Sequence, residues 1–158
     1  MNYDRSIKLK ARWICRLWLI LGLIAPFYVK AIDNPDAPDY LTDFASRANP
    51  YADALANAKN ISETATAAGK YHDFLDNELN KSYKQLMSKL DANSQSRLRD
   101  SQRAWLKFSQ AEVRFIDENW NSAEFGSSSA LSKAEYRNAL IKARIETLLG
   151  YLKNYPNP

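Results

Sequence analysis

Few residues of this chain have the types and the spacing that catalysis requires. Three carboxylates lie close together in the segment 94–121, and two of them could form an acid–base pair: Glu112, Asp117 and Glu118. Because charges of both signs surround them, a solvated helix face is the favoured interpretation. The single histidine, His72, stands beside an aspartate near the start of a helix, where a surface or capping role is more common than a general base.

Other kinds of chemistry are also poorly represented. Ser127, Ser128 and Ser129 lie together without the glycine-flanked pattern of a serine nucleophile. One cysteine and one histidine argue against a Cys/His zinc site. Trp105 has the spacing of a core residue. Trp120 lies at a helix end, and the sequence leaves open whether it packs in the core or stacks on a ligand. We therefore predict no catalytic residues, no metal and no cofactor, and a binding protein rather than an enzyme.

The excess of positive charge is concentrated at the start of the chain. The protein has 158 residues and a formal net charge of +4, but residues 1–31 hold six cations and one acid, which leaves 16 cations against 17 acids in the remainder. A nearly neutral body does not support nucleic-acid binding. The length and the 46% hydrophobic content predict one folded domain.

Residues 1–31 have the three parts of a secretory signal. A basic stretch through Arg16 precedes an apolar run of 13 residues, 17–29, and the cleavage region has small or apolar residues at Val29 and Ala31. The run is shorter than the roughly 20 residues of a membrane-spanning helix. We predict cleavage after Ala31 and a periplasmic or secreted protein; an uncleaved inner-membrane anchor, the one membrane contact considered, is the alternative.

An acidic segment containing prolines, residues 32–50, follows the signal. Four aspartates oppose one arginine there, and we predict an extended leader with one short helix at 39–47. A solvated linker is its commoner role, and docking on a basic partner is the alternative.

From residue 51 to 158 the apolar residues recur at helical spacing, without the alternation typical of strands. The predicted class is all-α, an antiparallel bundle of about four helices. The four predicted stripes are Tyr51, Leu55, Ala58 and Ile61, ending near Gly69; Leu75, Leu79, Tyr83, Leu86 and Leu90, on a helix 70–90; Leu98, Trp105, Phe108, Phe115 and Ile116, on a helix 94–121; and Tyr136, Leu140, Ala143, Thr147 and Tyr151.

The last helix has the clearest predicted start. A loop at 123–130 precedes Ser132 and Glu135, which have capping-box spacing, and Leu131 with Tyr136 fits a hydrophobic staple. We therefore predict that this helix begins at Ser132.

Two stretches resemble the LprI-type lysozyme inhibitor family. Residues 78–87 fit its "LN..Y..L" helix, and residues 98–108 fit "L..aQraWl.f". A glycine-serine loop and an arginine on the last helix complete the resemblance, which covers about residues 60–152. The signature positions, expected to be structural, are Leu79, Asn80, Tyr83, Gln102, Trp105 and Arg144. The resemblance implies a small, helical, exported protein that binds and inhibits a lysozyme.

The chain departs from the family pattern at four positions. Where family members carry cysteines that cross-link the helices, this chain has Ala67, Val113 and Tyr136, all apolar, which suggests replacement by packing. Ser109 replaces a usual arginine. If that arginine belongs to the binding surface, inhibition is affected; if it is a structural ion-pair partner, little changes.

A bundle can block a lysozyme with a loop that enters the enzyme's cleft, which carries two carboxylates in a generally basic body. The loop after the third helix offers hydroxyls and backbone N–H groups without a repelling charge, so we predict partner contacts at Phe125, Gly126, Ser127, Ser128 and Ser129. A simple flexible connection is the alternative role of this loop. The acidic leader would accelerate association with the basic body.

Two functions stay open from the sequence. One is inhibition of a lysozyme or other muramidase, from a host or delivered as a toxin by a competitor, so that the protein confers immunity. The other is a non-inhibitory periplasmic adaptor or scaffold that binds another envelope protein.

Overall fold

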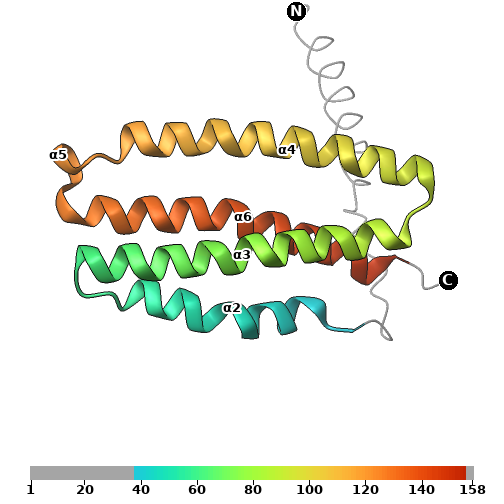
Figure 1. The fold of residues 1–158 in the computed structure, drawn as a ribbon, viewed down its shortest axis with the longest axis horizontal. Coiled ribbons are helices and arrows are strands. Elements are labelled where there is room, and N and C mark those ends of the chain that lie inside the picture. The colour runs from blue at the N-terminus through green and yellow to red at the C-terminus, as the bar shows by residue number, and fades with distance from the viewer. Residues whose placement is uncertain (1–37, 156–158) are drawn as a thin grey trace, which may run out of the picture. The chain divides into compact units, whose positions relative to one another are not determined.

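The computed structural model describes residues 38–155. The predicted signal segment, the cleavage after Ala31 and the first part of the leader lie outside these residues. Four long helices run antiparallel in the described part: α2 (Tyr40–Ala56), α3 (Ile61–Lys89), α4 (Ala92–Asn119) and α6 (Ser129–Asn154). A short helix, α5 (Ser122–Phe125), and a 3-10 turn, η1 (Gly126–Ser128), connect α4 to α6 (Figure 1). The predicted all-α bundle is confirmed, and no described helix is long and apolar enough to span a membrane.

Polar side chains define the starts of three long helices. The Asp39 carboxylate accepts the Thr42 backbone N–H, Asn60 accepts that of Glu63, and Asp91 accepts that of Ser94. Each cap satisfies a backbone donor that has no partner inside its own helix. The connections between consecutive long helices are short, with α2 ending at Ala56 before Ile61 and α3 ending at Lys89 before Ala92. Short connections make consecutive helices pack as antiparallel neighbours.

The hydrophobic core lies mainly between α2, α3 and α6. Leu75, Ile145 and Leu148 are completely buried, and Phe44 of α2 packs with them. The predicted stripe on 75–90 is confirmed: Leu75, Leu79 and Leu86 are buried, while Tyr83 and Leu90 pack against the core from its edge. Arg47 of α2 forms an ion pair with the buried Glu78 of α3, and this hydrogen bond raises the pKa of Arg47.

The predicted boundary at residue 50 is wrong, because α2 continues through Pro50 to Ala56. A proline inside a helix costs about 3 kcal/mol, but Phe44 and Ala48 before it and Leu55 after it are all buried. Burial on both sides of the proline keeps the segment helical. The predicted helix at 39–47 is the first half of α2.

Two other helix boundaries also differ from the prediction. The stripe of residues 51–61 spans two helices, because α2 ends at Ala56 and Asn60 caps α3. Gly69 does not end a helix: α3 passes through it, and there is open space where a Cβ would lie. Long flanking stretches of good helix formers outweigh the cost of one glycine, about 1 kcal/mol.

The predictions for the last helix were wrong in start and in face. The helix α6 begins at Ser129, and no side chain caps its N-terminus, so Ser132 lies inside the helix. Tyr136 and Tyr151 are exposed, and the buried face consists of Asn138, Ile141, Ile145, Leu148, Leu149 and Leu152. Tyrosine rings with a polar tip are stable at a surface, so aliphatic residues decide which face is buried.

The predicted apolar side of α4 is only partly buried. Leu98 and Ile116 are buried and Trp105 is half-buried against the core, but Phe108 and Phe115 are each 52% exposed. Two of the five predicted core residues of this helix are therefore surface residues.

Candidate functional site: the aromatic corner and the groove between α3 and α4

The connection between α4 and α6 is a folded corner and not the loop predicted at 123–130. Asn121 caps α5 by accepting the backbone N–H groups of Ala123 and Glu124. Gly126 follows with φ +60°, a conformation that residues with a Cβ rarely adopt. This glycine permits the chain to turn directly from α5 into α6.

The serine hydroxyls of this corner are partly used within it. Ser128 donates to the Phe125 carbonyl oxygen at 2.7 Å, and Ser129 donates to that of Gly126 at 2.8 Å. Ser129 is only 7% exposed, so it offers little surface to a partner. Phe125, Gly126, Ser127 and Ser128 are exposed.

Four aromatic side chains gather around this turn and form what we call the aromatic corner: Phe115, Trp120, Phe125 and Tyr136. The Trp120 ring is central, with centroid distances of 4.8 Å to Tyr136, 5.8 Å to Phe115 and 6.3 Å to Phe125. The role of Trp120, open from the sequence, is to hold together rings from α4, α5 and α6.

The aromatic corner is exposed although it is well ordered by contacts. Phe115 is 52% exposed, Phe125 48% and Tyr136 45%. Behind the rings, Lys133 donates to the Asp117 carbonyl oxygen at 3.0 Å, and Arg137 forms an ion pair with the Asp117 carboxylate. Clustered exposed aromatic rings on a fixed backbone are typical of the centre of a protein–protein contact.

Asp117 therefore joins α4 to two residues of α6. Glu118 is exposed on the following position of α4. The described residues contain no group of three or more His, Cys, Asp or Glu side chains that could hold a metal ion. His72 is exposed on α3.

Three of the six signature residues, Gln102, Trp105 and Arg144, meet where α4 faces α6. Arg144 of α6 donates from Nε to the Gln102 side-chain oxygen at 3.0 Å and from a terminal nitrogen to Ser101 at 3.2 Å. Its guanidinium carbon lies 6.0 Å from the centre of the Trp105 ring. Burial lowers the pKa of Arg144, which stays protonated because an arginine pKa is so high. We call Gln102, Trp105 and Arg144 the signature cluster.

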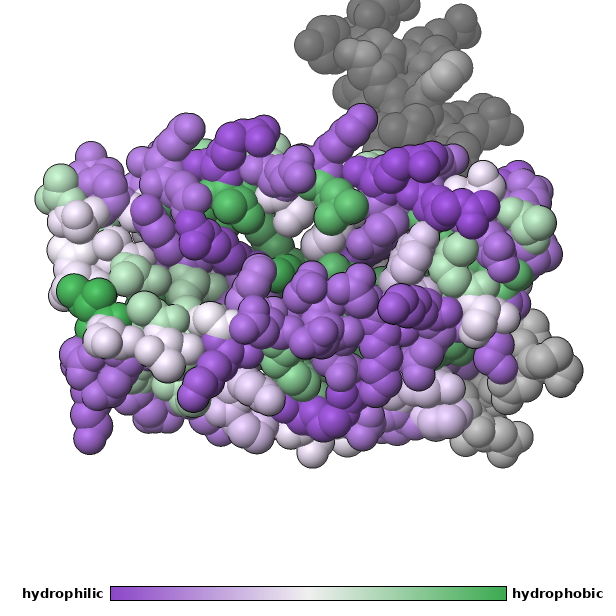
Figure 2. All heavy atoms as spheres, viewed as in Figure 1, coloured by the Kyte–Doolittle hydropathy of each residue, from purple (hydrophilic) through white to green (hydrophobic). Residues whose placement is uncertain are grey.

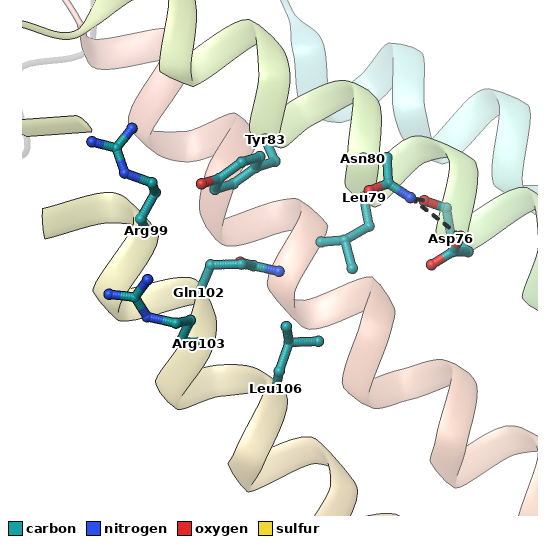
Figure 3. Close-up of a pocket in the computed structure, with 8 residues that line it drawn as sticks. All are labelled: Asp76, Leu79, Asn80, Tyr83, Arg99, Gln102, Arg103 and Leu106. Carbon is teal, nitrogen blue, oxygen red and sulfur yellow. Dashed lines mark hydrogen bonds between the residues drawn. The ribbon is translucent and has the colours of Figure 1, made fainter. Parts of the chain in front are cut away.

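Beside this cluster, a groove runs between α3 and α4. Its volume is about 290 Å³, and Figure 3 shows the side chains that line it: Asp76, Leu79, Asn80, Tyr83, Arg99, Gln102, Arg103 and Leu106. Apolar side chains lie in a hollow between hydrophilic surfaces on this face of the molecule (Figure 2). Arg99 and Arg103 extend from α4 on the side where the Tyr83 hydroxyl points (Figure 3). The structure thus brings Leu79, Asn80, Tyr83 and Gln102 together around one groove.

The four departures from the family pattern have different surroundings. Ala67 is half-buried and packs against the core, and Val113 is half-buried on α4. Tyr136 packs on Trp120 at the surface. Ser109 is half-buried on α4. Packing contacts therefore exist at two of the three positions where cysteines were expected.

Comparison with known protein families decides the classification. The family described as "Lysozyme inhibitor LprI" matches residues 52–148, which include α3, α4, the corner and most of α6. The chain belongs to this family. Comparisons with curated proteins and with solved structures give no match. At the level of the family, the LprI assignment supports a lysozyme-inhibitor-like function.

Proposed function

We propose that this LprI family member is exported to the bacterial envelope, binds a lysozyme or another peptidoglycan-degrading enzyme, and inhibits it through the aromatic corner. The family membership supplies the partner class. The observation that carries the choice of surface is the exposed aromatic cluster built around Trp120, which includes Phe125 on the turn where the sequence predicted the contact.

The surroundings of the corner suit a partner with a basic surface. Glu118 and Glu124 are exposed, two residues before Trp120 and one residue before Phe125 in the sequence, and they add negative charge to the end of α4 and to α5. Charged groups at a rim mainly accelerate association, whereas buried aromatic anchors slow dissociation. Phe125 and Phe115 are the expected anchors, and the hydroxyls of Ser127 and Ser128 the expected polar contacts.

The proposal is tested by titrating the purified protein into lysozymes of several structural classes while following the lysis of cell-wall suspensions. We expect stoichiometric inhibition of one class. Phe125→Ala should then raise the half-inhibitory concentration about tenfold or more, because removing an aromatic anchor costs about 1.4 kcal/mol or more of binding energy.

Phe108→Ala is the matched control. Phe108 is also a phenylalanine, 52% exposed on α4, but it is outside the aromatic corner. Its replacement should leave inhibition unchanged, and both variants should keep the helical circular dichroism of the parent. Equal effects of the two substitutions would remove the corner from the interface. Ser127→Ala with Ser128→Ala tests the hydroxyls separately.

A non-inhibitory adaptor is the competing function, and the same titration separates the two. An adaptor would leave every lysozyme active at large molar excess. Co-purification from the envelope with a membrane or secretion component would then identify its partner. If the target is a toxin delivered by a competitor, expression of the protein should protect cells from that toxin, which is the immunity role.

A further inference from the structure

The α3–α4 groove has a distribution of polar groups that the aromatic corner does not explain. On the α4 side, Arg99 has no acidic partner among the described residues, and Arg103 pairs only with Asp100 of its own helix turn. That pair is exposed on both sides and is therefore weak. Two arginines four residues apart face the same direction on a helix, so they form one cationic edge.

The remaining walls of the groove add further donors and an apolar surface. The Tyr83 hydroxyl points toward the side of α4 that carries Arg99 (Figure 3). A hydrogen bond from Arg144 holds Gln102 in place. Leu79 and Leu106 supply apolar surface between these polar groups. The one carboxylate in the groove, Asp76, lies on α3 and already accepts from the Asn80 amide at 3.2 Å.

This arrangement fits the chemistry of an acidic side chain. A carboxylate accepts hydrogen bonds in the planar, paired geometry that guanidinium groups offer, and a phenol can donate a further bond. The methylene groups of an aspartate or glutamate would pack on the two leucines. A volume of about 290 Å³ is sufficient for one or two such side chains.

We propose that the α3–α4 groove binds an acidic side chain of the inhibited lysozyme, through Arg99 and Arg103. This inference rests on the proposed function, because the enzyme supplies the carboxylate. Arg103 and Phe115 are separated by about 18 Å along α4 at 1.5 Å per residue. A protein–protein contact of ordinary size spans this distance, so a single partner is large enough to reach from the groove to the aromatic corner.

A phosphorylated or other polyanionic ligand fits the groove less well. Asp76 places a negative charge inside it, which repels a phosphate of charge about −2 more strongly than a single carboxylate, and the two leucines offer nothing to a second phosphate. Polyanions prefer extended rows of cations. The groove therefore favours a single carboxylate on an apolar stem.

The deciding variant replaces Arg99 and Arg103 by glutamine. Its control replaces Lys107 and Arg114, two other cations of α4 that do not line the groove, by glutamine. Both double variants lower the net charge by the same amount, so long-range attraction changes equally. In the lysis titration, we expect the groove variant to lose about tenfold or more in inhibition and the control less than about threefold. Equal inhibition by the two variants would overturn the inference while leaving the proposed function intact.

A second measurement does not require any lysozyme. Nuclear magnetic resonance titrations compare the capped peptides acetyl-Glu-Ala-Glu-amide and acetyl-Gln-Ala-Gln-amide on the protein. Saturable shifts at the side chains of Tyr83, Gln102 and the two arginines, with the glutamate peptide alone, support a carboxylate site even if the proposed function fails. Equal shifts with inorganic phosphate, or shifts spread over all surface cations, would overturn it.

Discussion

The two consecutive helices α3 and α4 have nearly the same length, 29 and 28 residues, but they differ in what they bury. Seven residues of α3 are buried, whereas on α4 only Leu98 and Ile116 are. The helix α3 lies between α2 and α6, whereas α4 contacts the bundle chiefly through α6. Length and amphipathic pattern alone therefore do not make a helix part of the core.

Polar contacts compensate for the small buried surface of α4. The signature cluster joins its first half to α6, and the contacts of Lys133 and Arg137 with Asp117 join its second half. The apolar residues that α4 does not bury, including Phe115 and Leu106, line the two candidate binding surfaces. The weakly packed helix is therefore the one that presents side chains to a partner.

The largest expected effect is on the free energy of unfolding, and it should differ between α3 and α4 because α3 buries more of its side chains. Leu75→Ala in α3 removes a completely buried side chain and should lower the free energy of unfolding by about 2–5 kcal/mol. Leu106→Ala in α4 removes a side chain that is 45% exposed and should change it by about 0.5 kcal/mol or less. Urea unfolding followed by circular dichroism measures both. Similar losses for the two variants would mean that α4 is as much part of the core as α3.

A smaller effect is expected at the signature cluster. Arg144→Ala removes two hydrogen bonds to α4 and the contact with Trp105, and should cost about 1–3 kcal/mol. Amide hydrogen exchange should accelerate in α4 more than in α3, because α4 depends on this attachment. Arg144→Lys retains the charge but lacks the planar guanidinium that donates to Gln102 and Ser101 together, so its stability should be only partly restored relative to Arg144→Ala. Uniform acceleration along the whole chain would show that the cluster stabilises the bundle as a unit.

The sequence was sufficient for the class of fold, the stripe on α3 and the approximate extent of α4. It misplaced α2 because Pro50 suggested an interruption, and only the burial of residues on both sides of the proline shows why the helix continues. The face of α6 was misassigned because Tyr136 and Tyr151 count as apolar in a periodicity although their rings lie at the surface. Counting only aliphatic residues when assigning the buried face would have identified Ile141, Ile145 and Leu148.

The candidate site was only partly visible in the sequence. Phe125 and Gly126 were placed on the partner surface, and the signature motifs named residues that meet around the groove. The grouping of Trp120, Phe115 and Tyr136 with Phe125 could not be predicted, because it depends on how α4, α5 and α6 meet in space. Arg99 and Arg103 are the missed residues. Their spacing of four residues on one helix was visible in the sequence. The sequence did not show that α3 lies opposite them and forms the other wall of the groove.

The smallest expected effect concerns the start of α4. The backbone N–H of Ser94 donates to Asp91 and lowers the pKa of this carboxyl, so the folded state binds its proton less tightly than the unfolded state. The resulting stabilisation is present above the unfolded pKa of about 4 and is lost as the pH falls through the lower folded pKa. Asp91→Asn retains a capping side chain but cannot titrate. Its stability should therefore fall less than that of the parent between pH 6 and pH 3.

Asp39→Asn provides the comparison, because Asp39 caps α2 and hydrogen bonds from Thr42 lower its pKa in the same way. Because α4 buries few residues, we expect its start to open first as the pH falls. Amide exchange near Asn93 and Ser94 should then accelerate at a higher pH than exchange near Thr42. The opposite order would contradict the weaker packing of α4.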